Sequence, residues 1–284
     1  MGCTVRNGKE MNWEILKNKL INSKYHYFHT DNGVLLCGDC LEIMKLLPNE
    51  SIDLVLTDPP YNISQNKKID RTEINSRSLK RTGKVKELNL NFGKWDFFES
   101  NREYLEFIHK VCNEFTPKTK ESCSLYMWAP RSEISFIEYI LVEVGWHIRS
   151  TLVWCKTNPV PQIFKVGYMS STEFCIFGTR MKGRKHFWNI NRGQRHSYWI
   201  TSICQGKERT SHPTQKKLEI VEDMVINSSQ EGDIVLDCFL GSGTTAEACE
   251  RLNRRWIGIE ISEEYCKIAK KRLTSMQQVL FYKE

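Results

Sequence analysis

Two kinds of apolar pattern alternate along the chain. One repeats every three or four residues, as in an amphipathic helix, and the other is a short continuous run, as in a buried strand. The helical pattern occupies residues 12–24, 41–48, 101–116, 133–145, 216–229, 240–253 and 262–273, the last with Ser262 as its expected N-cap. Strand-like runs occupy residues 51–61, 123–129, 147–156, 233–239 and 254–261, and an Asp-Asn-Gly turn predicts a hairpin over 25–37. The alternation predicts an α/β fold in which helices cover both faces of a mostly parallel sheet.

Two long stretches depart from this pattern because they are polar and basic. Residues 63–95 carry nine Lys/Arg against three acids, and their lack of apolar periodicity predicts a mobile loop. Residues 178–209 carry eight Lys/Arg against one acid. The aromatic residues interleaved among these cations are Phe187, Trp188, Tyr198 and Trp199. Two interpretations fit the second stretch. It is either a solvated surface loop with a few packed aromatic rings, or a nucleic-acid-binding surface in which the cations contact phosphates and the rings stack on bases.

Size and charge narrow the class of protein. The 284 residues suit one large domain, 1–284, or two small ones, and the net charge of +7 is compatible with a polyanionic partner. No apolar run approaches the ~20 residues that a membrane span requires. The N-terminal segment lacks the apolar centre of a secretory signal. Eleven scattered cysteines are typical of reduced thiols in the cytosol.

One set of residues has the composition of a metal site. His26, His29, Cys37 and Cys40 form an HxxH and a CxxC on the predicted hairpin. Side chains three positions apart in a strand point to opposite faces, which is poor geometry for chelation. We therefore expect no metal site.

The stretch LTDPPYN, residues 56–62, ends a buried strand in a stiff loop, because neither proline can donate to a sheet ladder. Its groups suit catalysis on an exocyclic amine of a nucleobase. The Asp58 carboxylate and the Pro59 carbonyl would accept the two amino hydrogens, and this localises the nitrogen lone pair as positive charge develops. Tyr61 offers a face for an extruded base, and Pro60 helps to hold the loop still. The structural alternative, a capping aspartate beside a packed tyrosine, explains the whole run less well.

The stretch IVLDCFLGSGTT, residues 234–245, predicts a strand, a Gly-x-Gly turn and a helix. The glycines let a ligand approach the backbone, and the helix N-terminus offers free N–H groups. The next strand ends in Glu260, where nucleotide-binding units place an acid on the ribose. Two ligand classes fit, a dinucleotide or adenosine attached to a small group. No Gly-Lys-Ser/Thr follows, which argues against a P-loop.

The combined motifs resemble those of the DNA amino-methyltransferases that use S-adenosylmethionine. The matching stretches are GDCLEIMKLLPNESIDLVLTDPPYN (38–62), WCKTNPVP (154–161), HPTQK (212–216) and DIVLDCFLGSGTTAEACERLNRRWIGIEISEEYCKIAKKRL (233–273). The catalytic loop precedes the cofactor loop, as in the permuted β-type enzymes of restriction-modification systems. The resemblance implies a Rossmann-like sheet of seven strands with a small inserted target-recognition region. It also implies that the strands leading to Asp58 and Gly241 are sheet neighbours.

The resemblance assigns residues to the cofactor and to DNA. The methionine side would be lined by Asp237, Phe239, Gly241, Ser242, Gly243 and Thr244, together with the catalytic Asp58. Glu260 would hold the ribose, Asp39 and Cys40 would meet the adenine ring, and Thr214 and Lys216 would border the pocket. Target recognition would lie in residues 157–210, with DNA contacts from Arg180, Lys182, Arg184, Lys185, Arg192 and Arg195. Cys238 and Lys217 replace prolines usual in the family, and we expect altered loop stiffness there.

The implied reaction is methyl transfer to N6 of adenine in a flipped-out base, without a covalent adduct or a metal. N4-cytosine methylation uses the same chemistry, but the family usually has serine at position 58 for that outcome. Ring-carbon methylation needs a Pro-Cys pair, which is absent from the sequence. Protein-glutamine methylation, a DNA-binding subunit without catalysis and an NAD-dependent dehydrogenase are further alternatives. Glutamine methylation would not explain the two basic stretches, and a subunit without catalysis would not explain the intact DPPY run. A dehydrogenase would need a hydride-transfer site, and the sequence shows none.

Partners and location follow from the same resemblance. Double-stranded DNA is the expected partner and a membrane is not. A homodimer and a restriction endonuclease acting on the same site are compatible with the family. The expected location is the cytoplasm of a prokaryote, at the nucleoid.

Overall fold

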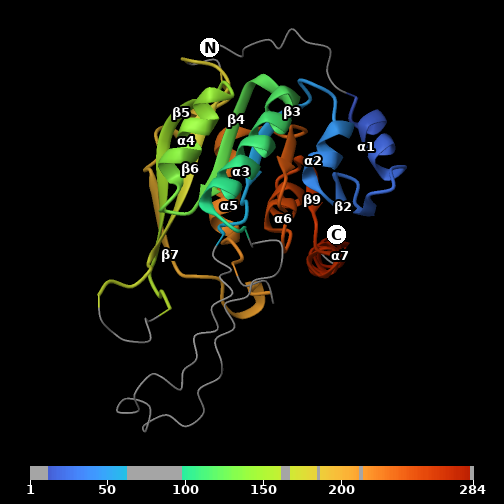
Figure 1. Cartoon of the computed structure of the whole chain (residues 1–284). Helices are drawn as coiled ribbons and strands as arrows, with labels where there is room; N and C mark the ends of the chain where they lie inside the picture. Colours follow the sequence, from blue (N-terminus) through green and yellow to red (C-terminus); the bar gives the residue numbers. More distant parts are fainter. Residues whose placement is uncertain (1–11, 63–97, 161–166, 184–185, 211–213, 282–284) are drawn as a thin grey trace.

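The computed structural model describes residues 12–62, 98–160, 167–183, 186–210 and 214–281 (Figure 1). The predicted mobile loop of 63–95 lies outside these residues. The described strands form one sheet in the order β1-β2-β9-β8-β3-β4-β6-β5-β7. Their bounds are β1 His26–His29, β2 Gly33–Cys37, β3 Ile52–Thr57, β4 Thr119–Ala129, β5 His147–Lys156, β6 Thr172–Thr179, β7 Tyr198–Thr201, β8 Ile234–Asp237 and β9 Arg255–Glu260.

Helices cover both faces of this sheet (Figure 1). One face carries α1 (Trp13–Ile21), α2 (Cys40–Ile43), α3 (Asn101–Phe115) and α4 (Ile134–Glu143). The other face carries α5 (Leu218–Ser228), α6 (Thr244–Arg251) and α7 (Glu263–Phe281). As predicted, the Ser262 hydroxyl accepts a hydrogen bond from the Tyr265 amide at the start of α7, at 3.4 Å. The α/β architecture is therefore the predicted one.

The strands of the sheet centre are buried on both faces. In β3, Leu54 and Leu56 point into one core while Val55 points into the other. Successive side chains of a strand alternate between faces, so an unbroken apolar run serves two cores at once. This is why these strands appear in the sequence as continuous apolar runs.

The pairing of β3 with β8 positions the site. The two strands are parallel, with Leu54 opposite Val235 and Val55 opposite Leu236. Parallel neighbours end at the same edge of a sheet, so the loop with Asp58 and the loop with Gly241 emerge side by side. The expected adjacency of these two strands is confirmed.

The sheet differs from expectation in two respects. Among the described residues it has nine strands instead of seven. In addition, the strand β6 runs antiparallel between β4 and β5, and β7 extends the edge beyond β5. Both strands lie within 157–210, so part of the range expected for target recognition belongs to the main sheet. The basic composition after residue 178 obscured β7, whereas β6 lies almost wholly before that stretch and its apolar run FCIF (174–177) was overlooked.

The argument from opposite faces was wrong for His26 and His29. A register irregularity between His26 and Phe28 turns the two imidazoles toward each other, with Nε2 of His26 and Nδ1 of His29 3.0 Å apart. The described residues contain no group of three or more side chains arranged to hold a metal. The ten described cysteines are free thiols. No helix in the described part of the chain is both long and apolar enough to cross a membrane.

Candidate active site

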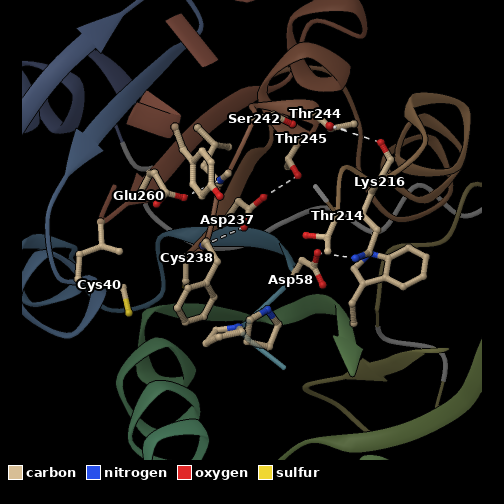
Figure 2. A pocket seen from close by; sticks show the side chains of 18 of the residues that line it. Cys40, Asp58, Thr214, Lys216, Asp237, Cys238, Ser242, Thr244, Thr245 and Glu260 are labelled. Atoms are coloured by element: carbon tan, nitrogen blue, oxygen red, sulfur yellow. Dashed lines mark hydrogen bonds and ion pairs between the residues drawn. The ribbon is translucent and has the colours of Figure 1, made fainter. Parts of the chain in front are cut away.

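A cavity of about 310 Å³ opens at the carboxyl edge of the sheet. Its walls come from the loops after β2, β3, β8 and β9 and from the segment before α5. Figure 2 shows Glu260 and Asp237 toward one side of it and Asp58 and Lys216 toward the other. The predicted residues that line it are Asp39, Cys40, Asp58, Pro59, Pro60, Tyr61, Thr214, Lys216, Asp237, Phe239, Gly241, Ser242, Thr244 and Glu260. The structure therefore brings nearly all of the sequence-predicted cofactor and catalytic residues together.

Gly243 is the predicted residue that does not line the cavity. Its φ is +83°, and a Cβ there would lie 3.0 Å from the Cβ of Ala269 on α7. The glycine is thus required by the left-handed turn and by the close approach of α6 to α7.

Asp237 lies buried at the end of β8 and is held by neutral donors. Its Oδ1 accepts from the Thr57 hydroxyl and the Phe239 amide, both at 3.1 Å, and its Oδ2 accepts from the Thr245 hydroxyl at 2.6 Å. Burial raises the pKa of Asp237 to about 7, although these hydrogen bonds oppose the shift. Asp237 therefore joins the ends of β3 and β8 to the first turn of α6.

Glu260 fixes the glycine turn. Its Oε2 accepts from the Gly241 amide and its Oε1 from the Ser262 amide, both at 2.8 Å. Burial raises the pKa of Glu260 above its ordinary value, and the backbone amides oppose that shift. Each carboxylate oxygen keeps further acceptor capacity, so Glu260 can still receive hydroxyl groups of a ligand.

The wall near β2 is made by Asp39 and Cys40. The Asp39 side chain caps α2 by accepting from the Leu41 amide at 2.9 Å. Burial raises the pKa of the Cys40 thiol to about 12, which keeps it neutral. Cys238, at the position where the family usually has proline, packs with its sulfur 3.5 Å from the Met44 sulfur. The substitution thus adds an apolar contact behind the cavity.

The Asp58 side of the cavity is organised by ammonium groups instead. The Lys216 Nζ lies 2.5 Å from Asp58 Oδ2 and 3.2 Å from Glu173 Oε2. Glu173, at the start of β6, also pairs with Lys156 Nζ at 2.5 Å. The lysine ammonium lies 5.3 Å from the Tyr61 ring centre and 5.1 Å from that of Trp128.

These charges set the ionisation of the site. Burial raises the pKa of Asp58, and Lys216 opposes that shift. Burial would also raise the pKa of Glu173, but Lys216 and Lys156 hold it below its ordinary value. The pKa of Lys216 is raised because the two carboxylates outweigh its burial. The site therefore holds a charged Lys216 between two carboxyl groups whose pKa values shift in opposite directions.

The structure adds site residues that the sequence did not reveal. Trp128, the next-to-last residue of β4, lines the cavity, together with Phe98, Phe107 and Tyr265. Glu173 joins through its ion pair with Lys216. The continuous apolar run FCIF (174–177) was a strand signal, although it does not tell at which edge of the sheet Glu173 lies.

The predicted DNA cations have mixed surroundings. Arg192 and Arg195 pair with Asp223 on α5, with nitrogen–oxygen distances of 2.8 and 3.2 Å. Arg180 donates to the Gly145 carbonyl, whereas Lys182 is exposed. Arg184 and Lys185 lie outside the described residues. Arg180, Arg192 and Arg195 therefore already make contacts within the protein.

Several known proteins are similar to this chain in sequence and in fold. The chain is 32% identical over 259 residues to the Type II methyltransferase M.HinfI of Haemophilus influenzae, covering 86% of this chain and 69% of that protein. The crystal structure of the M1.HpyAVI–SAM complex is 28% identical, with a TM-score of 0.61 over 84% of this chain and 98% of that one. The cytosine-N4-specific PvuII DNA methyltransferase, 18% identical with a TM-score of 0.68 over 87% of this chain and 88% of that one, shares the fold alone. Because the DNA methylase profile (N6_N4_Mtase) matches residues 52–271, the chain belongs to the DNA methylase family.

Proposed function

We propose that the chain transfers a methyl group from S-adenosylmethionine to N6 of an adenine that has left the DNA stack. The observation that carries this is one cavity that joins Asp58, on the double-proline loop, to Asp237 and Glu260, on the cofactor side. The family, the Type II relative and the M1.HpyAVI–SAM complex all support methylation of DNA with this cofactor.

The residues present fit S-adenosylmethionine. Glu260 offers acceptors for ribose hydroxyls, and the Gly241 turn, with φ of +54°, leaves space at the backbone. Buried Asp237 and Glu260 have no ammonium or guanidinium partner among the described residues, so the wall favours a cationic ligand. When bound, S-adenosylmethionine supplies a methyl group on a positively charged sulfur, which departs as a neutral thioether.

The chain's own groups act on the target amine. The Asp58 carboxylate and the Pro59 carbonyl accept its two hydrogens, so the nitrogen lone pair is free to form the new bond to carbon. One amino proton then leaves to water, which balances the charge. The Tyr61 ring, whose hydroxyl has its pKa raised by burial and therefore stays neutral, supports the base by stacking.

Adenine is favoured over cytosine by the aspartate at position 58. In the family that the sequence resembles, serine there usually accompanies N4-cytosine methylation. The likeness to PvuII methyltransferase concerns the fold, and it leaves N4-cytosine as the second candidate.

We also propose the permuted β-type organisation and a restriction-modification role. The order of the two motif loops and the pairing of β3 with β8 support the first. The name of the relative M.HinfI, a Type II methyltransferase, supports the second. A nuclease of the same site specificity, a homodimer and a place at the prokaryotic nucleoid stay predictions from the family resemblance.

The test is tritium transfer from labelled cofactor to DNA, followed by digestion to nucleosides. Label in N6-methyl-2′-deoxyadenosine is the expected result. Label in N4-methyl-2′-deoxycytidine would show that cytosine is the target base, and DNA without label would contradict the proposed function.

DNA binding is proposed for the segments of 157–210 that lie outside the sheet, including Lys182 and the predicted cations Arg180, Arg184, Lys185, Arg192 and Arg195. Neutralising Lys182 should weaken DNA binding and reduce the salt slope by about 0.9 for each phosphate that the protein no longer neutralises. Titrations of DNA affinity against salt measure this, with Lys45, an exposed lysine in the turn after α2, as the control cation. A slope equal to that of the wild type would place the DNA elsewhere.

A further inference from the structure

Lys216 is held in the cavity by the residues on either side of it. The Gln215 side chain accepts from the Thr210 amide and donates to the Glu208 carbonyl, both at 2.8 Å. The Lys217 ammonium pairs with the Glu208 carboxylate at 2.7 Å. Both neighbours thus tie this part of the chain to the turn before it, and Lys216 lines the cavity with a side chain that is only 8% exposed.

The Lys216 ammonium contacts one oxygen of Asp58 and leaves the other without a partner. Its Nζ lies 2.5 Å from Oδ2 and donates a hydrogen bond to it (Figure 2). Oδ1 is buried and accepts no hydrogen bond from the described residues. Because a buried acceptor without a donor costs free energy, such an oxygen in a cavity wall indicates a ligand group that donates to it.

The ammonium is also held by groups other than Asp58. Its Nζ lies 3.2 Å from Glu173 Oε2 on β6. The ring centres of Tyr61 and Trp128 lie 5.3 and 5.1 Å from it. Since these contacts do not depend on Asp58, Lys216 can restrain the Asp58 carboxylate instead of following its rotation.

We propose that Lys216 is a positioning residue for the reaction: by holding Oδ2, it fixes the Asp58 carboxylate so that Oδ1 accepts from the target amine. The inference rests on the proposed function, because it assigns Asp58 to that amine. The second amino hydrogen stays with the Pro59 carbonyl, so each acceptor takes one hydrogen. Lys216 thereby acts on the target side, whereas the family resemblance only placed it at the border of the cofactor pocket.

The test compares Lys216→Met with Lys120→Met. Methionine keeps an unbranched apolar side chain and removes the ammonium. Lys120 is the matched control, because its Nζ pairs at 2.9 Å with the buried Asp53 near the start of β3, whereas Asp58 follows the end of that strand. Three quantities are measured for each full-length variant: kcat against pH with saturating cofactor and DNA, the Kd for S-adenosylmethionine, and the melting temperature.

Lys216→Met should lower kcat near pH 7 roughly 10- to 100-fold, the range for losing a hydrogen bond to a charged group. It should also move the acidic limb of the kcat profile to higher pH. Burial raises the pKa of Asp58 and Lys216 opposes that shift, so without the lysine Asp58 becomes protonated, and stops accepting from the amine, at a higher pH. The Kd for the cofactor should stay unchanged, because Asp237 and Glu260 are intact. Lys120→Met should change the melting temperature alone.

Other titratable groups also face Asp58, and they are the same in every variant. They are Tyr61 on its own loop, Glu173 and Cys175 on β6, and Asp237 at the end of β8. Burial raises the pKa of Tyr61 and Cys175 well above their ordinary values, so both stay neutral. The pKa of Asp237 is about 7, but a limb set by Asp237 would have the same position in the wild type and in the variant.

The position of the acidic limb decides the inference. A limb that does not move would overturn it even if kcat falls, because Lys216 would then act only on structure. Weaker cofactor binding without a shift of the limb would overturn it in favour of a role at the cofactor. Complete loss of transfer at every pH in a folded variant would also overturn it, because the lysine would then take part in the chemistry itself.

A second variant covers the case in which Lys216→Met does not fold. Lys216→Gln keeps a neutral donor for Oδ2, so it should show the same upward shift of the limb with a smaller loss of kcat. A wild-type limb in Lys216→Gln would overturn the inference. None of these results touches the proposed function, which fails only if the wild-type protein transfers no label to DNA.

Discussion

The two sides of the cavity stabilise buried carboxylates by different means. On the cofactor side, Asp237 and Glu260 accept from hydroxyls and backbone amides. On the target side, Asp58 and Glu173 are paired with ammonium groups. Four acids at one edge of one sheet thus form two electrostatic environments.

This difference matches the charges of the two reactants. Dipoles hold a carboxylate in place without cancelling its charge, so the Asp237 side remains attractive to a cation. Ammonium groups cancel the charge of Asp58 and Glu173, which suits a neutral amine. The pKa of Asp237 rises to about 7 with burial, and Lys216 opposes the corresponding shift at Asp58. Substitutions on either side should therefore affect different steps.

Asp58→Ala should have the largest effect. It removes the acceptor that localises the amine lone pair, so methyl transfer should fall by roughly 100- to 1,000-fold, the scale seen when a preorganised electrostatic group is lost. Cofactor binding should remain largely intact, because Asp237 and Glu260 are unchanged. Tritium transfer and calorimetric titration measure the two quantities. Retained turnover would remove Asp58 from its role, and lost cofactor binding would show that the two sides are not independent.

Asp237→Asn should change how stability depends on pH. The folded-state pKa of Asp237, about 7, lies above its ordinary value, so the folded protein retains a proton that the unfolded chain has released. The free energy of unfolding should therefore decline as pH rises from ~4 to ~7, by at most ~4 kcal/mol from this group. Asparagine does not titrate and should lack this part of the decline. Urea unfolding of both proteins at pH 5 and pH 8 measures it, and parallel pH dependences would contradict the buried, proton-retaining Asp237.

Glu260→Gln should have the smallest effect of the three. The amide can still accept from the Gly241 or Ser262 backbone, but it loses the charge that strengthens hydrogen bonds to ribose. We expect roughly tenfold weaker cofactor binding, in line with ~1.4 kcal/mol for one charge-assisted hydrogen bond. The kcat at saturating cofactor should be unchanged, since Asp58 and Lys216 are untouched. A drop in kcat without a change in the Kd for the cofactor would show that Glu260 acts on the target amine rather than on the cofactor.

The sequence predicted that the residues around Asp237 would gather in one cavity, because most of them lie in one continuous strand–turn–helix unit. The run from Asp237 to Thr244 and the acid at Glu260 have fixed spacing, and local geometry converts that spacing into a site. The strand before Asp58 was equally clear, since an apolar run followed by two prolines leaves few alternatives. The pairing of β3 with β8 was predicted from the family resemblance of the motif order, because periodicity alone does not indicate which distant strands pair.

The sequence alone did not predict all of the residues on the Asp58 side of the cavity. Glu173 lies on the inner strand β6, within the range expected for target recognition, where no strand was predicted. Its ion pair with Lys216 joins residues 43 positions apart through the antiparallel placement of β6 between β4 and β5. Ion pairs have no sequence periodicity, so this pairing appears only once the sheet is assembled. The register irregularity at His26 was missed for a similar reason, since it depends on the partner strand β2.

The strand order also governs when activity can arise during synthesis. The strands β2 and β3 are close in sequence, yet β8 and β9 lie between them in the sheet. A ribosome must synthesise β8 and β9 before this gap can be filled, and contacts between such distant segments form slowly. A nascent or truncated chain that ends before β8 therefore has the DPPY loop but no neighbouring loop to hold the methyl donor. We therefore expect DNA to be methylated only by chains whose synthesis has passed β9.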